Sequence, residues 1–172
     1  VANCHKLPAN RFTRRCLTVS EIVDMWRPIV ENTGEKHWIF TVSPIRHIKD
    51  GLHANQLSKA ILLQAIDQLC QLSSANHLSY FPSYEIMLDE LRDYRFYAAD
   101  MLHPSDVAVD YIWQRFTSWA FTPETLQFAE AWERTELDLN HRPLHPDSDA
   151  HKAFLAKAME RRAKLEAMIN SS

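Results

Sequence analysis

The sequence predicts an α/β fold with few, short parallel strands and many helices. Two runs rich in β-branched and aromatic residues, 37–43 and 78–81, are closed by Pro44 and Pro82 and are typical of strands. We expect the first run to be buried on both faces, as strands of a parallel sheet are. A segment with helical spacing of apolar residues joins the two runs, which indicates a right-handed parallel crossover.

The helices are located by their apolar stripes and their boundary residues. The expected helices cover roughly 19–32, 54–73, 83–91, 104–119, 123–138 and 148–169. Thr18 or Ser20 can cap the first helix, and a stripe through Leu57 and Leu69 marks the second. Pro104 is expected at the first position of the fourth helix, because its missing N–H costs nothing there.

Two regions of different composition follow one another along the chain. Residues 1–121 contain both expected strands, whereas residues 122–172 read as helices, the last of them rich in Ala, Lys, Arg and Glu. We therefore expect a domain over 1–121 and a helical C-terminal extension over 122–172. The chain opens at Val1 on what reads as an extended segment already under way, so we expect it to be the C-terminal part of a longer protein.

Composition argues against several partners. The formal net charge is -3, so the sequence indicates neither nucleic acid nor a membrane surface as a partner. No apolar run approaches the roughly 20 residues that span a bilayer. The three cysteines lack metal-ligand spacing, and we expect reduced thiols, which favours the cytoplasm and leaves open a signal segment before Val1. The sequence predicts no oligomeric state.

Asp100 and His103 form the most informative motif. With a spacing of three, the Asp100 carboxylate can hold one nitrogen of the His103 imidazole while the second ring nitrogen faces a substrate. This is how the acid and the base of a serine-hydrolase triad are arranged; the third member is the serine. In the alternative interpretation, His103 caps a helix that Pro104 begins and Asp100 is a solvated loop residue. The chain has only two glycines and no Gly-x-Ser-x-Gly motif, so it offers no obvious nucleophile.

The loop after the first strand supplies further candidates for a pocket. Ser43 ends the strand, at the edge where open α/β sheets bind ligands. Pro44 removes a backbone N–H that could stabilise an oxyanion, so we expect Ser43 to line the pocket and not to attack. Arg46 and His47 follow and could contact an anionic or sugar substrate, although a solvated loop is the alternative.

A metal site is a further alternative. His47, His53, Asp100 and His103 could together hold an ion, but no short-range pair of ligands supports this arrangement. We therefore expect neither a metal nor a cofactor.

Several segments together resemble the GSCFA-domain proteins of bacteria, over roughly residues 1–120. These segments are Asn3-Cys4-His5-Lys6, Thr41-Val42-Ser43-Pro44-Ile45-Arg46-His47, Tyr80-Phe81-Pro82-Ser83-Tyr84-Glu85, Asp89-Glu90-Leu91-Arg92-Asp93-Tyr94-Arg95-Phe96-Tyr97 and Asp100-Met101-Leu102-His103-Pro104. The resemblance places the chain with the SGNH/GDSL-like hydrolases. It implies a flavodoxin-like three-layer α/β/α sandwich (SGNH-hydrolase-like), of which this chain is a helix-rich C-terminal portion with few strands.

The resemblance also implies a function. It implies a serine esterase or acyltransferase acting on a small-molecule or glycan ester, with Asp100 as the orienting acid, His103 as the base and Asn3 near the oxyanion. The family's serine lies in a Gly-Ser-Cys-Phe-Ala segment that this sequence does not contain, so we expect the chain alone to be inactive. The alternative is a non-catalytic module that binds a glycan or a protein partner on a hydrolase-derived fold.

Overall fold

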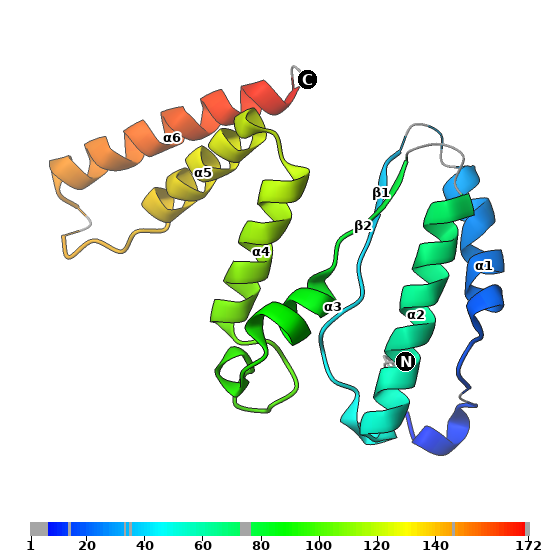
Figure 1. Cartoon of the computed structure of the whole chain (residues 1–172). Helices are drawn as coiled ribbons and strands as arrows, with labels where there is room; N and C mark the ends of the chain where they lie inside the picture. The colour runs from blue at the N-terminus through cyan, green and yellow to red at the C-terminus, as the bar shows by residue number, and fades with distance from the viewer. Residues whose placement is uncertain are drawn as a thin grey trace. The chain divides into compact units, whose positions relative to one another are not determined.

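The computed structural model describes residues 7–13, 15–32, 34, 36–72, 77–145 and 147–170. Most of these residues are helical, and a two-stranded parallel sheet adds the β component, so the α/β prediction holds at this level (Figure 1). The chain divides into two compact units, Val1–Ile112 and Trp113–Ser172, which we describe separately. The predicted domain boundary at 121/122 stays a prediction.

The helices match the expected ranges closely, whereas the strands are shorter than expected. The α-helices are α1 Val19–Glu31, α2 Leu52–Leu72, α3 Ser83–Glu85, α4 Asp106–Ala120, α5 Pro123–Leu139 and α6 Asp149–Asn170. The strands are β1 Trp38–Phe40 and β2 Leu78–Tyr80. Short 3₁₀ turns cover Ala9–Arg11, Ile48–Asp50 and Tyr94–Phe96, and a π-helical segment covers Ile86–Leu91.

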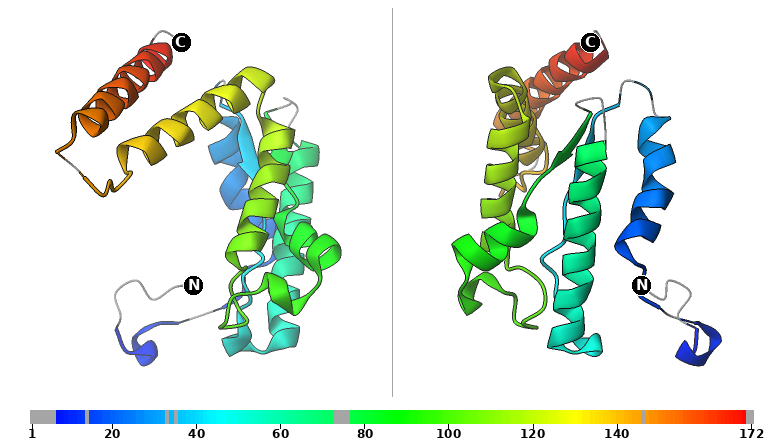
Figure 2. Two further views of the ribbon diagram at one scale, coloured as in Figure 1. Left: turned by 90° about the vertical axis from the view of Figure 1, so that its left-hand side faces the viewer. Right: turned by 45° about the vertical axis from the view of Figure 1, so that its right-hand side comes forward.

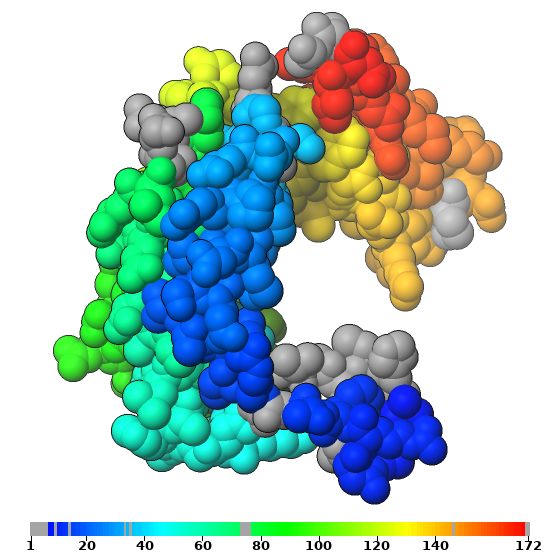
Figure 3. Space-filling view, turned by 90° about the vertical axis from the view of Figure 1, so that its right-hand side faces the viewer, coloured from blue at the N-terminus to red at the C-terminus, as the bar shows by residue number. Residues whose placement is uncertain are grey.

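The first helix begins where a capping box forms. Thr18 Oγ1 accepts the N–H of Glu21 at 3.3 Å, and the Glu21 carboxylate accepts the N–H of Thr18 at 2.8 Å. Of the two predicted caps, Thr18 is therefore the one that the structure uses. The apolar face of α1 then packs along α2, and the two helices run side by side (Figures 2 and 3). Their shared core consists of Ile22, Val23, Ala65 and Leu69.

The sheet is parallel, with α2 as its crossover. Trp38 lies opposite Leu78 and Phe40 opposite Tyr80. The rings of Trp38 and Phe40 contact Trp26 of α1, with ring centroids 5.8 and 5.0 Å away. Because side chains alternate along a strand, the neighbouring Ile39 points to the other face, where it is 42% exposed. The expectation that this strand is buried on both faces is therefore wrong.

Two further clusters form the core beneath the loops that follow the strands. Val42, Ile66 and Tyr84 join the exit of β1 to α2 and α3. Met87, Leu91, Tyr97 and Ala108 pack the π-helical segment against the start of α4. Full burial of a large apolar side chain contributes about 1.5–3 kcal/mol to the free energy of unfolding. These clusters therefore stabilise the segments that carry the loops after the strands.

The expectation that Pro104 begins a helix is wrong. Tyr97 and Pro104 form an isolated antiparallel bridge, in which Ala98 N–H donates to the His103 carbonyl and Ser105 N–H to the Phe96 carbonyl, both at 2.8 Å. Helix α4 starts only at Asp106, and Ser105 Oγ accepts the Ala108 N–H at 3.4 Å at its entry. His103 therefore belongs to a closed loop and does not cap a helix.

The second unit contains the antiparallel pair of long helices α5 and α6, joined by a connector (Figure 1). Thr122 caps α5 through a 3.2 Å bond from the Thr125 N–H, and Pro123 takes the first helical position. Thr135 and Ala158 are buried between the helices, and Arg161 of α6 pairs with Asp138 of α5. Within the described residues, no helix is long and apolar enough to cross a membrane.

Candidate functional site

Asp100 and His103 are in direct contact. His103 Nδ1 lies 2.5 Å from Asp100 Oδ2, and with a carboxylate as the acceptor it is Nδ1 that carries the proton. The other carboxylate oxygen, Oδ1, accepts the backbone N–H groups of Leu102 at 2.9 Å and His103 at 3.0 Å. Asp100 thus binds both the ring and the backbone of His103, and Nε2 is the imidazole nitrogen left to meet a substrate.

These hydrogen bonds set the charge of Asp100. The N–H groups of His103 and Leu102, followed by the His103 side chain, lower the pKa of the Asp100 carboxyl to about 2. Asp100 is therefore ionised at neutral pH, as an orienting acid must be if it is to stabilise an imidazolium. Both side chains remain accessible, with 45% of the Asp100 side chain and 57% of the His103 side chain exposed.

The turn between the two residues has an unusual backbone conformation. Met101 has φ of 60°, in the left-handed region that a non-glycine residue adopts only at a cost of about 1–2 kcal/mol. Such a residue persists where surrounding contacts over-determine it. Here the Tyr97–Pro104 bridge holds the two ends of the loop, and Arg46 binds its middle.

Arg46 brings the loop after β1 to the Asp100–His103 pair. Its backbone N–H donates to the Leu102 carbonyl at 3.2 Å, and its Nη1 donates to the Met101 carbonyl at 3.3 Å. The guanidinium carbon lies 3.8 Å from the centroid of the Tyr97 ring. Of the four candidates proposed beside the pair, Arg46 is the one that, within the described residues, the structure joins by hydrogen bonds to the two residues between Asp100 and His103.

The remaining candidates have other surroundings. The Ser43 hydroxyl accepts the N–H of Ile45 at 3.3 Å in a local turn, and the Ser43 carbonyl accepts a bond from Lys59. His47 uses its backbone N–H to bond Asn55 Oδ1 at 2.9 Å, while its side chain is exposed. Asn3 lies outside the described residues. The structure therefore gives Ser43 and His47 a place in the same loop as Arg46, without a bond to His103.

Sequence reasoning missed Asn55 and Lys59 of α2. They lie one helical turn apart, are only 6% and 3% exposed, and fasten the two ends of the 43–47 loop. Burial lowers the pKa of the Lys59 ammonium, whose nitrogen also lies 5.8 Å from the centroid of the Tyr84 ring. The expected stripe placed Leu57 inside, but Leu57 is 52% exposed. The available signal was an Asn and a Lys four residues apart in the first two turns of the helix that follows the strand.

The proposed metal ligands are not brought together as a set. In the part of the chain that the structure describes, no group of three or more His, Cys, Asp or Glu side chains is arranged to hold an ion. His53 lies in the first turn of α2, and Asn55 of the same helix binds the 43–47 loop.

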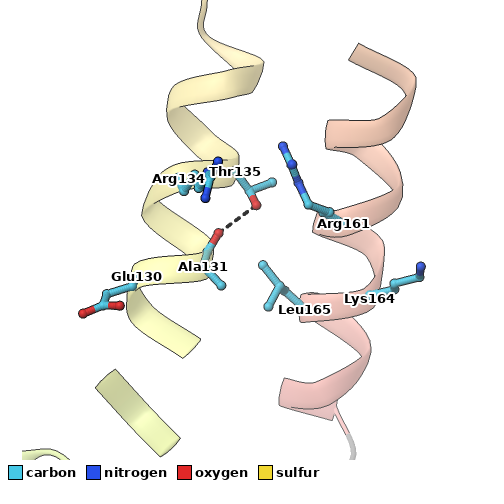
Figure 4. A pocket seen from close by; sticks show the side chains of 7 residues that line it. All are labelled: Glu130, Ala131, Arg134, Thr135, Arg161, Lys164 and Leu165. Carbon is cyan, nitrogen blue, oxygen red and sulfur yellow. Dashed lines mark hydrogen bonds between the residues drawn. The ribbon is translucent and has the colours of Figure 1, made fainter. Parts of the chain in front are cut away.

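A separate pocket of about 660 Å³ lies between α5 and α6 in the second unit (Figure 4). Its lining residues are Glu130, Ala131, Arg134, Thr135, Arg161, Lys164 and Leu165. Two of its cations are already paired, Arg161 with Asp138 and Lys164 with Glu160 at 2.7 Å. Since no feature of this lining points to a particular ligand, we assign the pocket none.

Comparison with protein families identifies the chain. The model of the GSCFA family matches residues 1–116, and the model of the GSCFA domain protein, C-terminal domain, matches residues 132–171. The chain therefore belongs to the GSCFA family. The matched residues reach well beyond the roughly 120 that the motifs covered, so the C-terminal helices share the family likeness. Comparison with curated proteins and with solved structures gives no significant match.

Proposed function

We propose that the protein is a serine hydrolase, an esterase or acyltransferase acting on an acyl ester, in which Asp100 and His103 form the acid–base half of the site. The observation that carries this proposal is the 2.5 Å contact between His103 Nδ1 and Asp100 Oδ2, with an ionised carboxylate and Nε2 available. A fold of the SGNH type, a flavodoxin-like three-layer sandwich, is part of the same proposal. The parallel β1–α2–β2 crossover supports it.

The proposed reaction uses the pair in two proton transfers. His103 Nε2 takes the proton of a serine hydroxyl as its oxygen bonds to the ester carbonyl carbon, and the Asp100 carboxylate stabilises the imidazolium that forms. The imidazolium then protonates the departing alcohol, which leaves an acyl-enzyme. Water or a second alcohol, deprotonated by His103, releases the acyl group and restores the serine.

The nucleophile of this proposal lies outside the 172 residues, in the Gly-Ser-Cys-Phe-Ala segment that the family likeness implies. In the described residues, no hydroxyl or thiol is hydrogen-bonded to His103, whose bonds go to Asp100 and Ala98. Asn3 would contribute to the oxyanion hole. The second candidate is a non-catalytic module that binds a glycan or another partner on a hydrolase-derived fold, and the experiment below separates it from the hydrolase.

A fluorophosphonate probe tests the proposal on the full-length protein that includes the Gly-Ser-Cys-Phe-Ala segment. We expect labelling of its serine and, because general-base assistance contributes at least about 100-fold, a loss of about that size in His103→Gln. His77→Gln is the matched control, since His77 is exposed at the start of β2, and it should label at the wild-type rate.

Two outcomes would contradict the hydrolase proposal. One is the absence of serine labelling in the wild-type protein. The other is labelling that His103→Gln and Asp100→Asn leave unchanged, which would mean that the pair takes no part in activating the serine. Either result would favour the binding module.

A further inference from the structure

We propose that Arg46 is a positioning residue that holds Asp100 through the peptide groups of the 101–103 turn, and thereby orients His103. The geometric claim stands on contacts alone, whereas its meaning for catalysis rests on the function proposed above. Arg46 touches neither the reacting atoms nor, by any hydrogen bond in the described residues, the side chains of the pair.

Arg46 binds two peptide groups of the 101–103 turn. The Met101 carbonyl, which accepts from Arg46 Nη1, belongs to the same peptide group as the Leu102 N–H, which donates to Asp100 Oδ1. The Leu102 carbonyl, which accepts from the Arg46 N–H, belongs to the same peptide group as the His103 N–H. That second N–H also donates to Asp100 Oδ1. Arg46 therefore binds the far end of both peptide groups that hold Asp100.

Two physical effects pass through these peptide groups. A peptide group is planar and stiff, so fixing its carbonyl oxygen fixes the direction in which its N–H points. A donor on the carbonyl also polarises the group and strengthens its N–H as a donor, most of all when the donor is a cation. Arg46 thus aims both N–H groups at Asp100 and strengthens at least the one on the 101–102 peptide.

The conformation of Met101 makes this help necessary. With φ of 60°, Met101 would relax to a negative φ if nothing held it, and the 101–102 peptide would turn. The Leu102 N–H would then leave the Asp100 carboxylate. Arg46 opposes that rotation by binding the carbonyl of the same peptide group.

Arginine suits this position better than lysine. Its planar guanidinium stacks on the Tyr97 ring, which is itself only 8% exposed and belongs to the bridge that closes the loop. A lysine ammonium keeps the charge but lacks the planar face and the fork of donors. The pair Arg46→Lys and Arg46→Met therefore separates geometry from charge.

The test is an NMR titration of the Asp100 carboxyl carbon together with observation of the His103 Nδ1 proton. In the wild type we expect a pKa of about 2 for Asp100 and a far-downfield Nδ1 proton, as short bonds to carboxylates give. In both Arg46→Met and Arg46→Lys the Asp100 pKa should rise by about 1 pH unit towards its ordinary value, and the Nδ1 proton should move upfield.

Two further variants make the test specific. Arg95→Met is the matched control, because Arg95 also stacks on a ring, Phe96, at 5.0 Å, but bonds no carbonyl of the 101–103 turn. It should leave both signals unchanged. Adding Met101→Gly to Arg46→Met should restore them in part, since glycine adopts the left-handed conformation freely. This rescue distinguishes positioning of the turn from a general loss of stability.

Several results would overturn the inference. Unchanged Asp100 and His103 signals in Arg46→Met would do so, as would wild-type signals in Arg46→Lys, which would assign the effect to charge alone. Fluorophosphonate labelling of the full-length protein reads out the catalytic part separately, with an expected loss of about 10-fold in Arg46→Lys. If the NMR signals change as expected but the wild type does not label, the positioning stands and the proposed hydrolase function fails.

Discussion

Asp100 uses its two carboxylate oxygens differently, and this division explains why a loop can hold an acid–base pair. Oδ1 receives two backbone N–H groups, while Oδ2 receives the imidazole. The same carboxylate therefore shapes the turn and orients the ring, and the pair is built within one short turn of the chain. Such a pair is local in sequence, which is why the spacing of three could indicate the contact between the two side chains, although it left a solvated Asp100 open as the alternative.

The lowered pKa of Asp100 predicts how stability depends on pH. The folded pKa of about 2 is below the ordinary value of 3.8, so the stabilising contribution is complete above the ordinary value and is lost as the pH falls through about 2. Urea unfolding should show wild type more stable than Asp100→Asn at neutral pH, with a difference that shrinks as the pH falls from about 4 to about 2 and vanishes below it.

Asp110→Asn is the control for this pH dependence, because Asp110 is exposed on α4. Its difference from the wild type should be small at every pH. Glu21 also has a pKa lowered to about 2, first by Arg15 and then by the backbone at Thr18, so the wild type loses stability from two carboxylates in this range. A difference between wild type and Asp100→Asn that stays constant down to pH 2 would contradict the assignment to Asp100.

The residues that sequence reasoning missed are long-range partners. Asn55 and Lys59 act on the 43–47 loop only because the crossover folds α2 back along β1. Arg46 was identified as a candidate from its loop, but its bonds to the 101–103 turn join segments far apart in the chain. Spacing carries information about neighbours in sequence, so it could indicate that Asp100 and His103 meet but could not indicate the residues that support them.

At the scale of elements, α2 is the part that fixes the 43–47 loop. Asn55→Ala should lower the free energy of unfolding by about 1–2 kcal/mol, because it leaves the His47 N–H without its buried acceptor. Lys59→Met should change it by less than about 1 kcal/mol, since the lost bond to Ser43 is offset by relief from burying a cation. Denaturant titration measures both.

Gln64→Ala, exposed on the same helix, is the control for these two variants and should be neutral. We expect Asn55→Ala to lower the free energy of unfolding more than Lys59→Met does. Equal losses in the two variants would show that the Lys59 ammonium stabilises the loop more than its burial costs.

The helices could be predicted well because their signals are local. Thr18 and Thr122 cap α1 and α5 by bonds to residues three positions on, and both helices begin where expected. Pro104 misled for a physical reason: a proline suits the first turn of a helix and also an edge position without an N–H donor. In the bridge to Tyr97, Pro104 occupies such an edge position. The spacing of residues around Pro104 does not indicate that Tyr97 is its partner.

At the scale of the molecule, the two units have separate buried residues, so a local defect should stay local. Ala158 of α6 and Ala65 of α2 are both fully buried. Ala158→Asp should place a charge between α5 and α6 at a cost of about 2 kcal/mol or more and speed amide exchange over 123–170. Exchange followed by mass spectrometry should show α1 and α2 unchanged.

Ala65→Asp provides the reciprocal experiment and should speed exchange in α1 and α2 while sparing α5 and α6. Faster exchange in both units from either variant would show that they unfold as one. The division within α4 has no mark in the sequence, because Asp106–Ala120 contains neither glycine nor proline. The sequence-based boundary lies instead beside Thr122 and Pro123, residues that are typical of a helix start.

The Tyr97–Pro104 bridge has a consequence for how this region varies in evolution or by design. Because the loop enters and leaves the fold at one closed point, both members of the pair lie inside a single short segment that the bridge spans. An insertion between Ala98 and His103 would change the positions of Asp100 and His103 together. An insertion in the connector before α6 would leave both in place. Length variation among relatives should therefore be absent from the loop and common in the connector.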